Sequence, residues 1–379
     1  MKVAFLYYNL YDPDGERLLI GGVETYLHRL MALSAAMGFE PVMFQAAQIP
    51  FERRLGPAVV VGVPVRERSI SRQRRALYAA ALRRLERTDM IVFGADHCSV
   101  RSDWRRAVSI QHGVSWDLPS SFATRKEWCS SGVGAQVKKV QLNLRGLRFF
   151  DNCQNRVCVD YNFLNWYRAI RGESPGGSVW VIPNCCQLAP RERIGRGDTP
   201  ATRVLFARRF TTYRGTRIMA EAIDHVLSRR SDVLFTFAGE GPDEGYLRDR
   251  FEHCENVRFT KYRPEQCMEV HLEHDIAVVP SVASEGTSLS VAEAMGAGCA
   301  VVASAVGGIT SMILDGFNGV LAMPAAGEFA AAILRLAGDT RLRREMGENA
   351  YRTAAGCFDA GRWNAKWKGV LEQVAAIQP

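Results

Sequence analysis

The stretch IAVVPSVASEGTSLSVAEAMGAGCAVVAS, residues 276–304, combines a strand, a loop, a helix and a second strand. Its apolar ends, 276–281 and 300–304, predict buried strands, and residues 288–298 between them have the spacing of a helix. Continuous apolar strands joined through a helix are typical of a parallel sheet that is covered on both faces. The stretch therefore predicts an α/β fold.

The same alternation of short apolar runs and helical patterns extends along the whole chain. Helices are predicted over 22–38 and 216–230, and the further predicted strands are 3–8, 41–46, 58–63, 90–95, 107–112, 156–160, 179–183, 203–208, 233–239 and 257–261. Residues 187–202, rich in Pro, Gly and Arg without apolar periodicity, read as a linker. We expect two Rossmann-like domains facing across a cleft, residues 1–186 and 203–360, with a helix over 361–376 packing back on the first.

The composition is that of a soluble globular protein with about two or three domains. The chain has 379 residues, of which 47% are hydrophobic and 23% charged. Its ten cysteines contain no CxxC pair, so we expect free and mostly buried thiols. The opening MKVAFLYYNLYDPDGE is too short for a secretory signal and reads as a first strand, which favours a cytoplasmic location.

Positive charge is concentrated in the first half of the chain. Residues 1–182 hold 25 of the 48 Lys and Arg and 16 of the 40 Asp and Glu, a net charge of +9, which leaves −1 for the rest. Residues 65–89, with eight arginines and three acidic residues, read either as a solvated helix face or as a surface for anionic membrane on its inner side. No RNA- or DNA-binding motif accompanies this charge, so we expect no nucleic-acid partner.

The loop and helix of the opening stretch carry two carboxylates, Glu285 and Glu293, eight positions apart. At about 100° per residue they cannot share one direction, so they would serve different parts of an elongated ligand. The amides between them open a helix at the carboxyl end of a strand, a favourable place for phosphate. A capping box from Ser290 to Glu293, which needs no ligand, is the structural alternative.

Residues 280–321 resemble the donor-binding segment of GT-B glycosyltransferases, specifically the large retaining family 4. The resembling features are P-S-x-x-E-G, the second glutamate, E-A-M-x-x-G and the later glycines. Other landmarks follow the family's order: GGVETYLHRL near the start, QHG (111–113), IPN (182–184), FARRFTTYRGT (206–216) and AGEGP (238–242). The resemblance covers nearly the whole chain and implies a GT-B fold.

The resemblance also implies a role for individual residues. Glu285 would contact the sugar of a nucleotide-sugar donor and Glu293 its ribose hydroxyls. Arg209 matches the arginine of the diphosphate, and Arg214 stands where the family usually has lysine. Arginine keeps the charge and offers a planar fork to phosphate. The amides that would meet the diphosphate or the sugar belong to Gly286, Thr287, Ser288 and Leu289.

Further candidates lie outside this segment. Gly21 and Gly22 open a helix after the first strand, where they suit either a phosphate or an ordinary turn. His112, at a strand end, is either structural or the histidine that contacts the donor sugar in the family. Tyr262 falls in the region that holds the nucleobase. The DxD spacing in YDPDG (11–15) reads as a turn, and we expect no metal.

We hypothesise a retaining glycosyltransferase that needs no cofactor and uses a UDP- or GDP-sugar as donor. Its acceptor would be a glycan or lipid-linked oligosaccharide of cell-surface polysaccharide synthesis. A GT-B sugar-nucleotide 2-epimerase and a non-catalytic partner- or membrane-binding GT-B protein are the alternatives. An NAD-dependent dehydrogenase is disfavoured, because GGVETY does not provide the G-x-G-x-x-G fingerprint.

Overall fold

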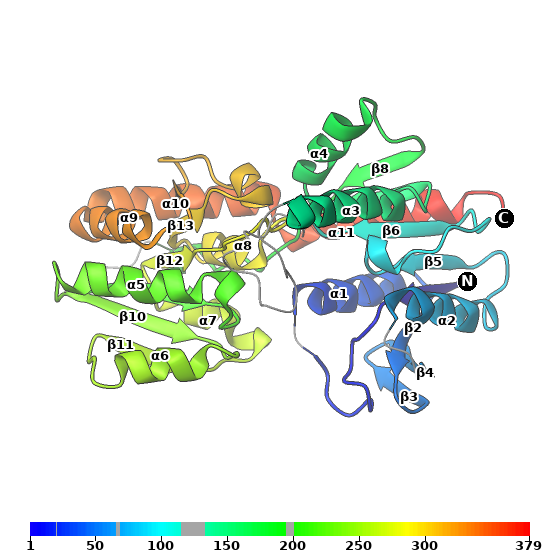
Figure 1. The fold of residues 1–379 in the computed structure, drawn as a ribbon, viewed down its shortest axis with the longest axis horizontal. Coiled ribbons are helices and arrows are strands. Elements are labelled where there is room, and N and C mark those ends of the chain that lie inside the picture. The colour runs from blue at the N-terminus through cyan, green and yellow to red at the C-terminus, as the bar shows by residue number, and fades with distance from the viewer. Residues whose placement is uncertain (20, 66–68, 115–132, 195–200) are drawn as a thin grey trace. The chain divides into compact units, whose positions relative to one another are not determined.

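The computed structural model describes the chain except for residues 20, 66–68, 115–132 and 195–200 and the side chains of 133 and 135. The chain divides into two compact units (Figure 1). The first unit comprises residues 1–112, 136–182 and 363–379, and the second comprises 113–135 and 183–362. Parts of the predicted linker (195–200) and of the predicted basic surface (66–68) lie outside the described residues.

The first unit is built on an eight-stranded sheet of order β3-β4-β2-β1-β5-β6-β7-β8. Only the β3–β4 pair is antiparallel, and the remaining pairs are parallel. The strands are β1 (Lys2–Leu6), β2 (Glu40–Ala47), β3 (Phe51–Leu55), β4 (Ala58–Pro64), β5 (Met90–Phe93), β6 (Ala107–Gln111), β7 (Asn155–Cys158) and β8 (Ser178–Val181).

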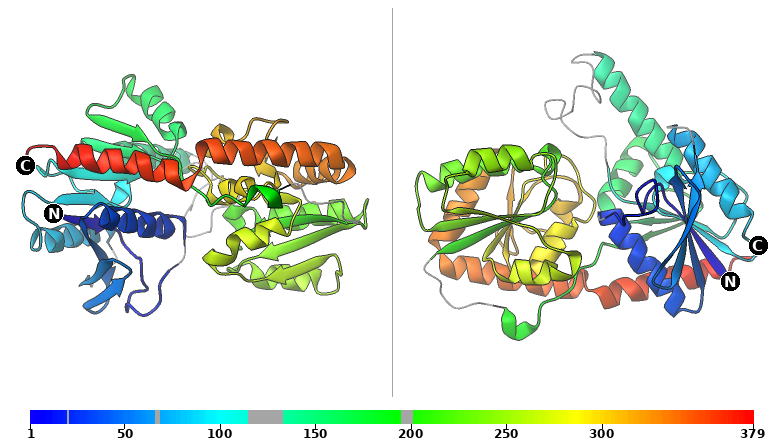
Figure 2. Two further views of the ribbon diagram at one scale, coloured as in Figure 1. Left: turned by 180° about the vertical axis from the view of Figure 1, so that it is seen from behind. Right: turned by 90° about the horizontal axis from the view of Figure 1, so that it is seen from below.

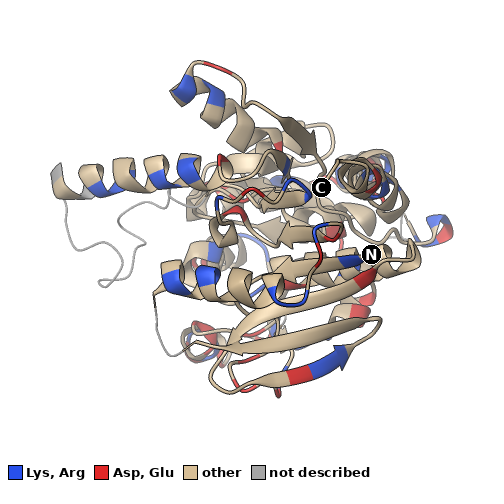
Figure 3. Ribbon diagram, turned by 90° about the vertical axis from the view of Figure 1, so that its right-hand side faces the viewer, with Lys and Arg blue, Asp and Glu red and all other residues tan. Residues whose placement is uncertain are grey.

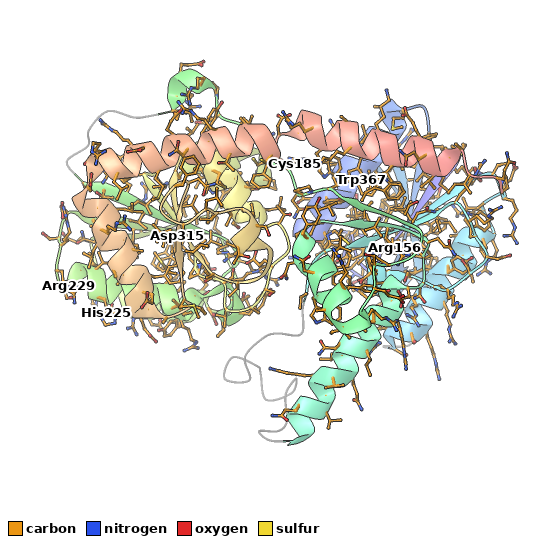
Figure 4. The ribbon with its side chains drawn as sticks, turned by 90° about the horizontal axis from the view of Figure 1, so that it is seen from above. Arg156, Cys185, His225, Arg229, Asp315 and Trp367 are labelled. Atoms are coloured by element: carbon orange, nitrogen blue, oxygen red, sulfur yellow. The ribbon has the colours of Figure 1, made fainter. Side chains whose placement is uncertain are left out.

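Helices cover both faces of this sheet. They are α1 (Gly22–Ala36), α2 (Ile70–Leu82), α3 (Val133–Phe150), α4 (Tyr161–Arg171) and α11 (Ala360–Ala375). Leu77 and Ala81 of α2 pack on one face, and Figure 2 shows α1 and α11 on the other. Trp367, labelled on α11 in Figure 4, is fully buried and donates its indole N–H to the Tyr26 hydroxyl of α1 at 2.7 Å. This bond satisfies the buried indole, as the polar end of a tryptophan requires.

The second unit is built on a parallel six-stranded sheet of order β11-β10-β9-β12-β13-β14. Numbered from β9 as 1, these strands have the order 3-2-1-4-5-6, which is the order of a Rossmann sheet. The chain adds strands on one side of β9 as far as β11 and then continues on the other side with β12, so the strand order reverses between β9 and β12. The strands are β9 (Thr202–Ala207), β10 (Val233–Ala238), β11 (Val257–Thr260), β12 (Ile276–Val279), β13 (Ala300–Ser304) and β14 (Val320–Ala322).

Two helical layers cover the second sheet because its strands are apolar on both sides. One layer, packed against Val204 and Phe206, consists of α5 (Thr216–Leu227), α6 (Glu244–Phe251) and α9 (Ala326–Gly338). The other, packed against Ala277 and Val279, consists of α7 (Cys267–Leu272), α8 (Leu289–Gly296) and α10 (Thr340–Cys357). The predicted α/β class with two Rossmann-like sheets is confirmed.

Each predicted strand has an observed counterpart, but two observed strands were missed. β3, FERRL, is a charged edge strand without an apolar run, and β14 has only three residues.

The nine cysteines among the described residues are free thiols; Cys129 lies outside these residues. Within the described part of the chain, no helix is both long enough and apolar enough to cross a bilayer.

Candidate functional site

The reversal of strand order in the second sheet brings two loops to one edge. Arg208 follows β9, and Glu285 lies in the loop after β12, which pairs with β9 in parallel. In an open α/β sheet, ligands bind outside the carboxyl ends of the strands at such a reversal. The fold alone therefore places these two loops at the usual binding position.

Glu285 is held there by two arginines and a hydroxyl. Its Oε1 lies 2.6 Å from a guanidinium nitrogen of Arg208 and 2.6 Å from one of Arg214. Ser281 donates its hydroxyl to the same oxygen. We call these four residues the Glu285 cluster. Every contact described for the carboxylate ends on Oε1, so Oε2 is the oxygen that a ligand hydroxyl could reach.

The cluster keeps Glu285 ionised. Burial alone would raise the pKa of this carboxyl, but the charges of Arg208 and Arg214 and the Ser281 hydrogen bond outweigh it and hold the pKa well below its usual range. A carboxylate with so low a pKa has no proton to donate at neutral pH and is a weak general base. Its chemistry is therefore that of a hydrogen-bond acceptor and a fixed negative charge. With two arginines against one glutamate, the cluster keeps one positive charge.

The loop that carries Arg214 is fixed by a close approach to the end of β12. Gly215 has a φ of +82°, and a Cβ at this position would overlap the carbonyl oxygen of Pro280. The Val282 amide donates to the Tyr213 carbonyl at 3.1 Å across the same junction. Only glycine fits both the left-handed backbone and the contact, so the sequence RGT positions Arg214 beside Glu285.

The predicted diphosphate arginine, Arg209, is not part of the cluster. Its side chain is exposed and has no ion-pair partner among the residues that the structure describes. Its neighbour Arg208, which sequence reasoning missed, is buried and bonds to Ser281 at 2.7 Å and to the Arg214 carbonyl at 3.3 Å. The two arginines thus face different surroundings: Arg208 is committed to the protein, whereas Arg209 is available to a ligand.

The segment between the two glutamates begins helix α8 as predicted, but the capping box is wrong. The helix begins at Leu289 with Ser288 as its N-cap residue, so Ser290 is already inside it. Gly286, Thr287 and Ser288 are buried. The Ser288 hydroxyl has no hydrogen-bond partner in the described part of the chain.

A second unpartnered polar atom lies next to this helix end. Asn184, in the predicted IPN landmark, donates its amide to the Thr287 carbonyl at 2.5 Å. Its own Oδ1 is buried without a partner among the described residues. Buried polar atoms are normally paired, and unpaired ones need an explanation. A polar ligand at the start of α8 would supply partners for Asn184 and Ser288.

Glu293 lies further along α8, beside Cys267 and His271 of α7. The candidate ligand atoms of these three residues lie within 4.8 Å of one another, a donor set of the kind that zinc accepts. However, the His271 ring nitrogen Nδ1 lies 2.8 Å from the Cys267 carbonyl oxygen. Burial and the charge of Glu293 raise the pKa of the Cys267 thiol. Without a metal, the thiol therefore stays protonated beside the Glu293 carboxylate.

Tyr262 comes close to Glu293. Burial and the charge of Glu293 raise the pKa of its hydroxyl. The ring is half-buried against a small apolar group at the ends of β9 and β10, formed by Leu205, Ala207 and Ala238. Tyr262 and Glu293 are therefore near neighbours, as a shared role in nucleoside binding requires. That role stays a prediction.

The remaining candidates belong to the first unit. Gly21 is the N-cap residue of α1, and a Cβ there would collide with the carboxylate of Glu24. The carboxylate of Glu24 thus already lies over the start of this helix.

His112 has its Nε2 2.8 Å from the Gly94 carbonyl and its ring edge-on to Tyr26. Burial lowers the pKa of His112 to about 4, so the ring is neutral, donates from Nε2 and keeps the Nδ1 lone pair for a ligand.

Comparison with known proteins agrees with this geometry. Residues 201–339 match the family described as glycosyl transferases group 1. An alpha-D-kanosaminyltransferase of Streptomyces kanamyceticus is 28% identical over 195 residues, 48% of each chain. A D-inositol 3-phosphate glycosyltransferase of Corynebacterium aurimucosum is 30% identical over 190 residues, 47% of this chain and 45% of the relative. The chain thus spans about half the length of the curated relatives it matches.

Solved structures extend the likeness over the whole chain at the level of fold. Sucrose-phosphate synthase from Thermosynechococcus elongatus has a TM-score of 0.74 at 18% identity and covers 99% of both chains. HepE of Anabaena in complex with UDP-glucose has a TM-score of 0.71 at 17% identity, covering 98% of this chain and 100% of that one.

The chain therefore has the fold of the GT-B glycosyltransferases, and the family resemblance inferred from the sequence is confirmed. Its residues 201–339, which begin just before β9 and carry the whole Glu285 cluster, match the model of the group 1 glycosyl transferases.

Proposed function

We propose that this protein is a retaining glycosyltransferase that moves a sugar from a nucleotide-diphosphate sugar to an acceptor hydroxyl. The observation that carries the proposal is the ionised Glu285 held by Arg208 and Arg214 where the second sheet reverses its strand order. The family match of residues 201–339 supports it. HepE, whose structure holds UDP-glucose, supports a nucleotide-sugar donor.

In this proposal the cluster acts on charge and orientation. Oε2 of Glu285 accepts hydrogen bonds from the sugar hydroxyls and fixes the sugar beside the leaving group. Arg214 and the exposed Arg209 neutralise the diphosphate, on which negative charge grows as the bond to the anomeric carbon breaks. The amides at the start of α8 add the positive end of the helix dipole.

The proton of the acceptor needs no basic side chain. The bond from the anomeric carbon to the phosphate oxygen breaks, and the new bond to the acceptor oxygen forms on the same face. The acceptor proton passes to the departing phosphate oxygen. Glu285 is a poor base for this proton, because the two arginines stabilise its ionised carboxylate. Arg208 acts through Glu285 and is a positioning residue.

The other parts of the substrate follow the same proposal. Glu293 binds the ribose hydroxyls, Tyr262 contacts the base, and His112 accepts a sugar hydroxyl at Nδ1. Gly21 and Gly22 lie against the diphosphate or the acceptor. The donor is a UDP- or GDP-sugar, and the acceptor is a glycan or a lipid-linked oligosaccharide of cell-surface polysaccharide synthesis, handled in the cytoplasm or on the inner face of the membrane.

A donor screen tests the proposal. Purified protein is incubated with UDP-, GDP- and dTDP-sugars, and release of the free nucleotide is measured with and without candidate acceptors. We expect slow hydrolysis of one donor class, which Glu285→Gln lowers on the order of a hundredfold or more and the exposed control Glu269→Gln leaves unchanged. Conversion of a donor into its 2-epimer without release of nucleotide would instead identify an epimerase, and no turnover of any donor would contradict the proposal.

A further inference from the structure

A pocket with a volume of about 560 Å³ lies within the first unit, away from the residues assigned above. It is formed by the first turns of α2, the second half of α3 and the residues after α3. We call it the arginine pocket; it is lined by Ser71, Arg74, Gln141, Leu144, Arg145, Arg148, Phe149 and Asn152. Three of these side chains are cationic, and none is acidic. Figure 3 shows the Lys and Arg residues along α3.

Arg74 is half-buried, whereas Arg145 and Arg148, the other two cations of the pocket, are exposed. Its guanidinium lies 5.0 Å from the centre of the Phe149 ring, and that of Arg145 lies 5.2 Å from the same ring. Nε and Nη1 of Arg74 are buried and have no hydrogen-bond partner among the described residues. Burial, together with the charges of Arg75 and Arg145, lowers the pKa of this guanidinium. Arginine nevertheless stays charged, so two buried N–H groups of this half-exposed cation are left without an acceptor.

The pocket also lies where the first sheet reverses its strand order. That sheet turns between β1 and β5, which pair in parallel. Arg74 interacts electrostatically with Tyr8, two residues after β1, and with Cys98, in the short helix after β5. The carboxyl ends of these strands are the usual binding edge of such a sheet. Arg74 lies near the start of α2, whose dipole favours the same sign of ligand charge.

The lining defines the chemistry of the ligand. Three guanidinium groups without a carboxylate suit a group of two negative charges with several acceptor oxygens, such as a phosphate ester. Ser71, Gln141 and Asn152 could bond hydroxyls beside it, and Leu144 with Phe149 could cover an apolar part. The Glu285 cluster in the second unit, which keeps a single spare positive charge, is by contrast built around a carboxylate.

We infer that the arginine pocket binds a phosphate group of the acceptor, with Arg74 as its central anchor. The inference rests on the proposed function, because only a transferase has an acceptor. It adds a substrate class: the acceptor is a phosphorylated molecule, either a soluble phosphate ester or the phosphorylated headgroup of a lipid. The arginines would recognise the phosphate group itself, which the soluble ester and the lipid headgroup have in common.

The test measures phosphate binding by the full-length protein directly. Isothermal titration with glucose 6-phosphate is one arm, and flotation with phosphatidylcholine vesicles containing phosphatidic acid is the other. Arg74→Gln should weaken binding in at least one arm by about tenfold or more, the cost of losing a charge-assisted contact. The control Arg75→Gln, an exposed arginine one residue further along α2, should leave binding within about twofold of wild type.

The arm that responds identifies the source of the phosphate. Arg145→Gln, an exposed position that tolerates substitution, repeats the test if Arg74→Gln does not fold. Equal binding by wild type, Arg74→Gln and Arg145→Gln, or no binding by wild type in either arm, overturns the inference. Hydrolysis of a nucleotide-sugar donor by wild-type protein is scored separately. Hydrolysis without phosphate binding contradicts only this inference, whereas phosphate binding without hydrolysis contradicts the proposed function and, with it, the acceptor role of the pocket.

Discussion

The Glu285 cluster and the arginine pocket occupy equivalent places in their sheets but use arginine differently. Each lies near the point where strand order reverses, β9 and β12 in one unit and β1 and β5 in the other. In the cluster, Arg208 and Arg214 share one carboxylate at 2.6 Å. In the pocket, Arg74 has buried nitrogens with no partner in the described part of the chain. Nε of Arg208 is also unpartnered there, but this guanidinium is ion-paired with Glu285, whereas no ion pair is described for Arg74.

The largest effect should come from removing the charge at the centre of the cluster. Glu285→Gln keeps the shape of the side chain but leaves two arginines without their carboxylate and weakens the acceptor for sugar hydroxyls. We expect turnover of the donor to fall on the order of a hundredfold or more. Steady-state rates with the donor that the screen identifies provide the measurement. Glu269→Gln, an exposed glutamate paired with Arg193, is the control, and an equal loss in both variants would refute the assignment.

Substitutions at the adjacent residues Arg208 and Arg209 should affect stability and activity differently. Arg208→Ala removes a buried partner of Glu285 and should lower the free energy of unfolding by about 3–5 kcal/mol. Arg209→Ala, at an exposed position, should change it by less than about 0.5 kcal/mol and should still reduce turnover on the order of a hundredfold, because a diphosphate contact acts in the transition state. Urea denaturation and donor kinetics distinguish the two. If Arg209→Ala kept wild-type turnover, Arg209 would have no part in the mechanism.

A smaller effect is expected at the second glutamate. Glu293→Gln retains an acceptor oxygen but loses the charge that strengthens bonds to two ribose hydroxyls. We expect the KM for the donor to rise about tenfold with kcat nearly unchanged, as for a contact made equally in ground and transition states. Glu273→Gln, an exposed glutamate that pairs with Arg258, is the control. A fall in kcat instead would place Glu293 at the reacting end of the donor.

The smallest effect concerns pH. Burial lowers the pKa of His112 to about 4 from 6.5, so as pH falls the unfolded chain takes up this proton before the folded protein does. The stability that this difference provides is complete above about pH 6.5 and is lost as pH falls towards about 4. His112→Gln should therefore reduce the loss of unfolding free energy between ~pH 7.5 and ~pH 5. His274, whose pKa is also lowered to about 4, retains some of this pH dependence in the variant. If the slope of unfolding free energy against pH were the same in His112→Gln and wild type, His112 would not be buried in solution.

The sequence predicted the features that depend on apolar runs and on the order of motifs. β12, α8 and β13 lie close to their predicted bounds because their strands are continuous apolar segments. Glu285 and Arg214 were both singled out, and the structure brings them together. Gly215 explains why: the RGT sequence allows the close approach to Pro280 that no residue with a Cβ could make.

Other features left no readable pattern. Arg208 and Arg209 are consecutive, and only the direction of the chain after β9 buries the first and exposes the second. Ser281 contributes through a loop contact with Glu285 that has no spacing rule. The arginine pocket combines α2 with α3, a helix that was not predicted, so its residues are far apart in the sequence. Contacts between distant segments depend on tertiary structure, which local patterns do not record.

The most direct test of the account is a crystal structure of the protein with an intact nucleotide-diphosphate sugar and a non-reacting acceptor analogue. We expect a sugar hydroxyl within hydrogen-bond distance of Glu285 Oε2, with the diphosphate against Arg214 and Arg209. A donor bound with its sugar out of reach of Glu285, or its diphosphate in contact with neither arginine, would contradict the central claim.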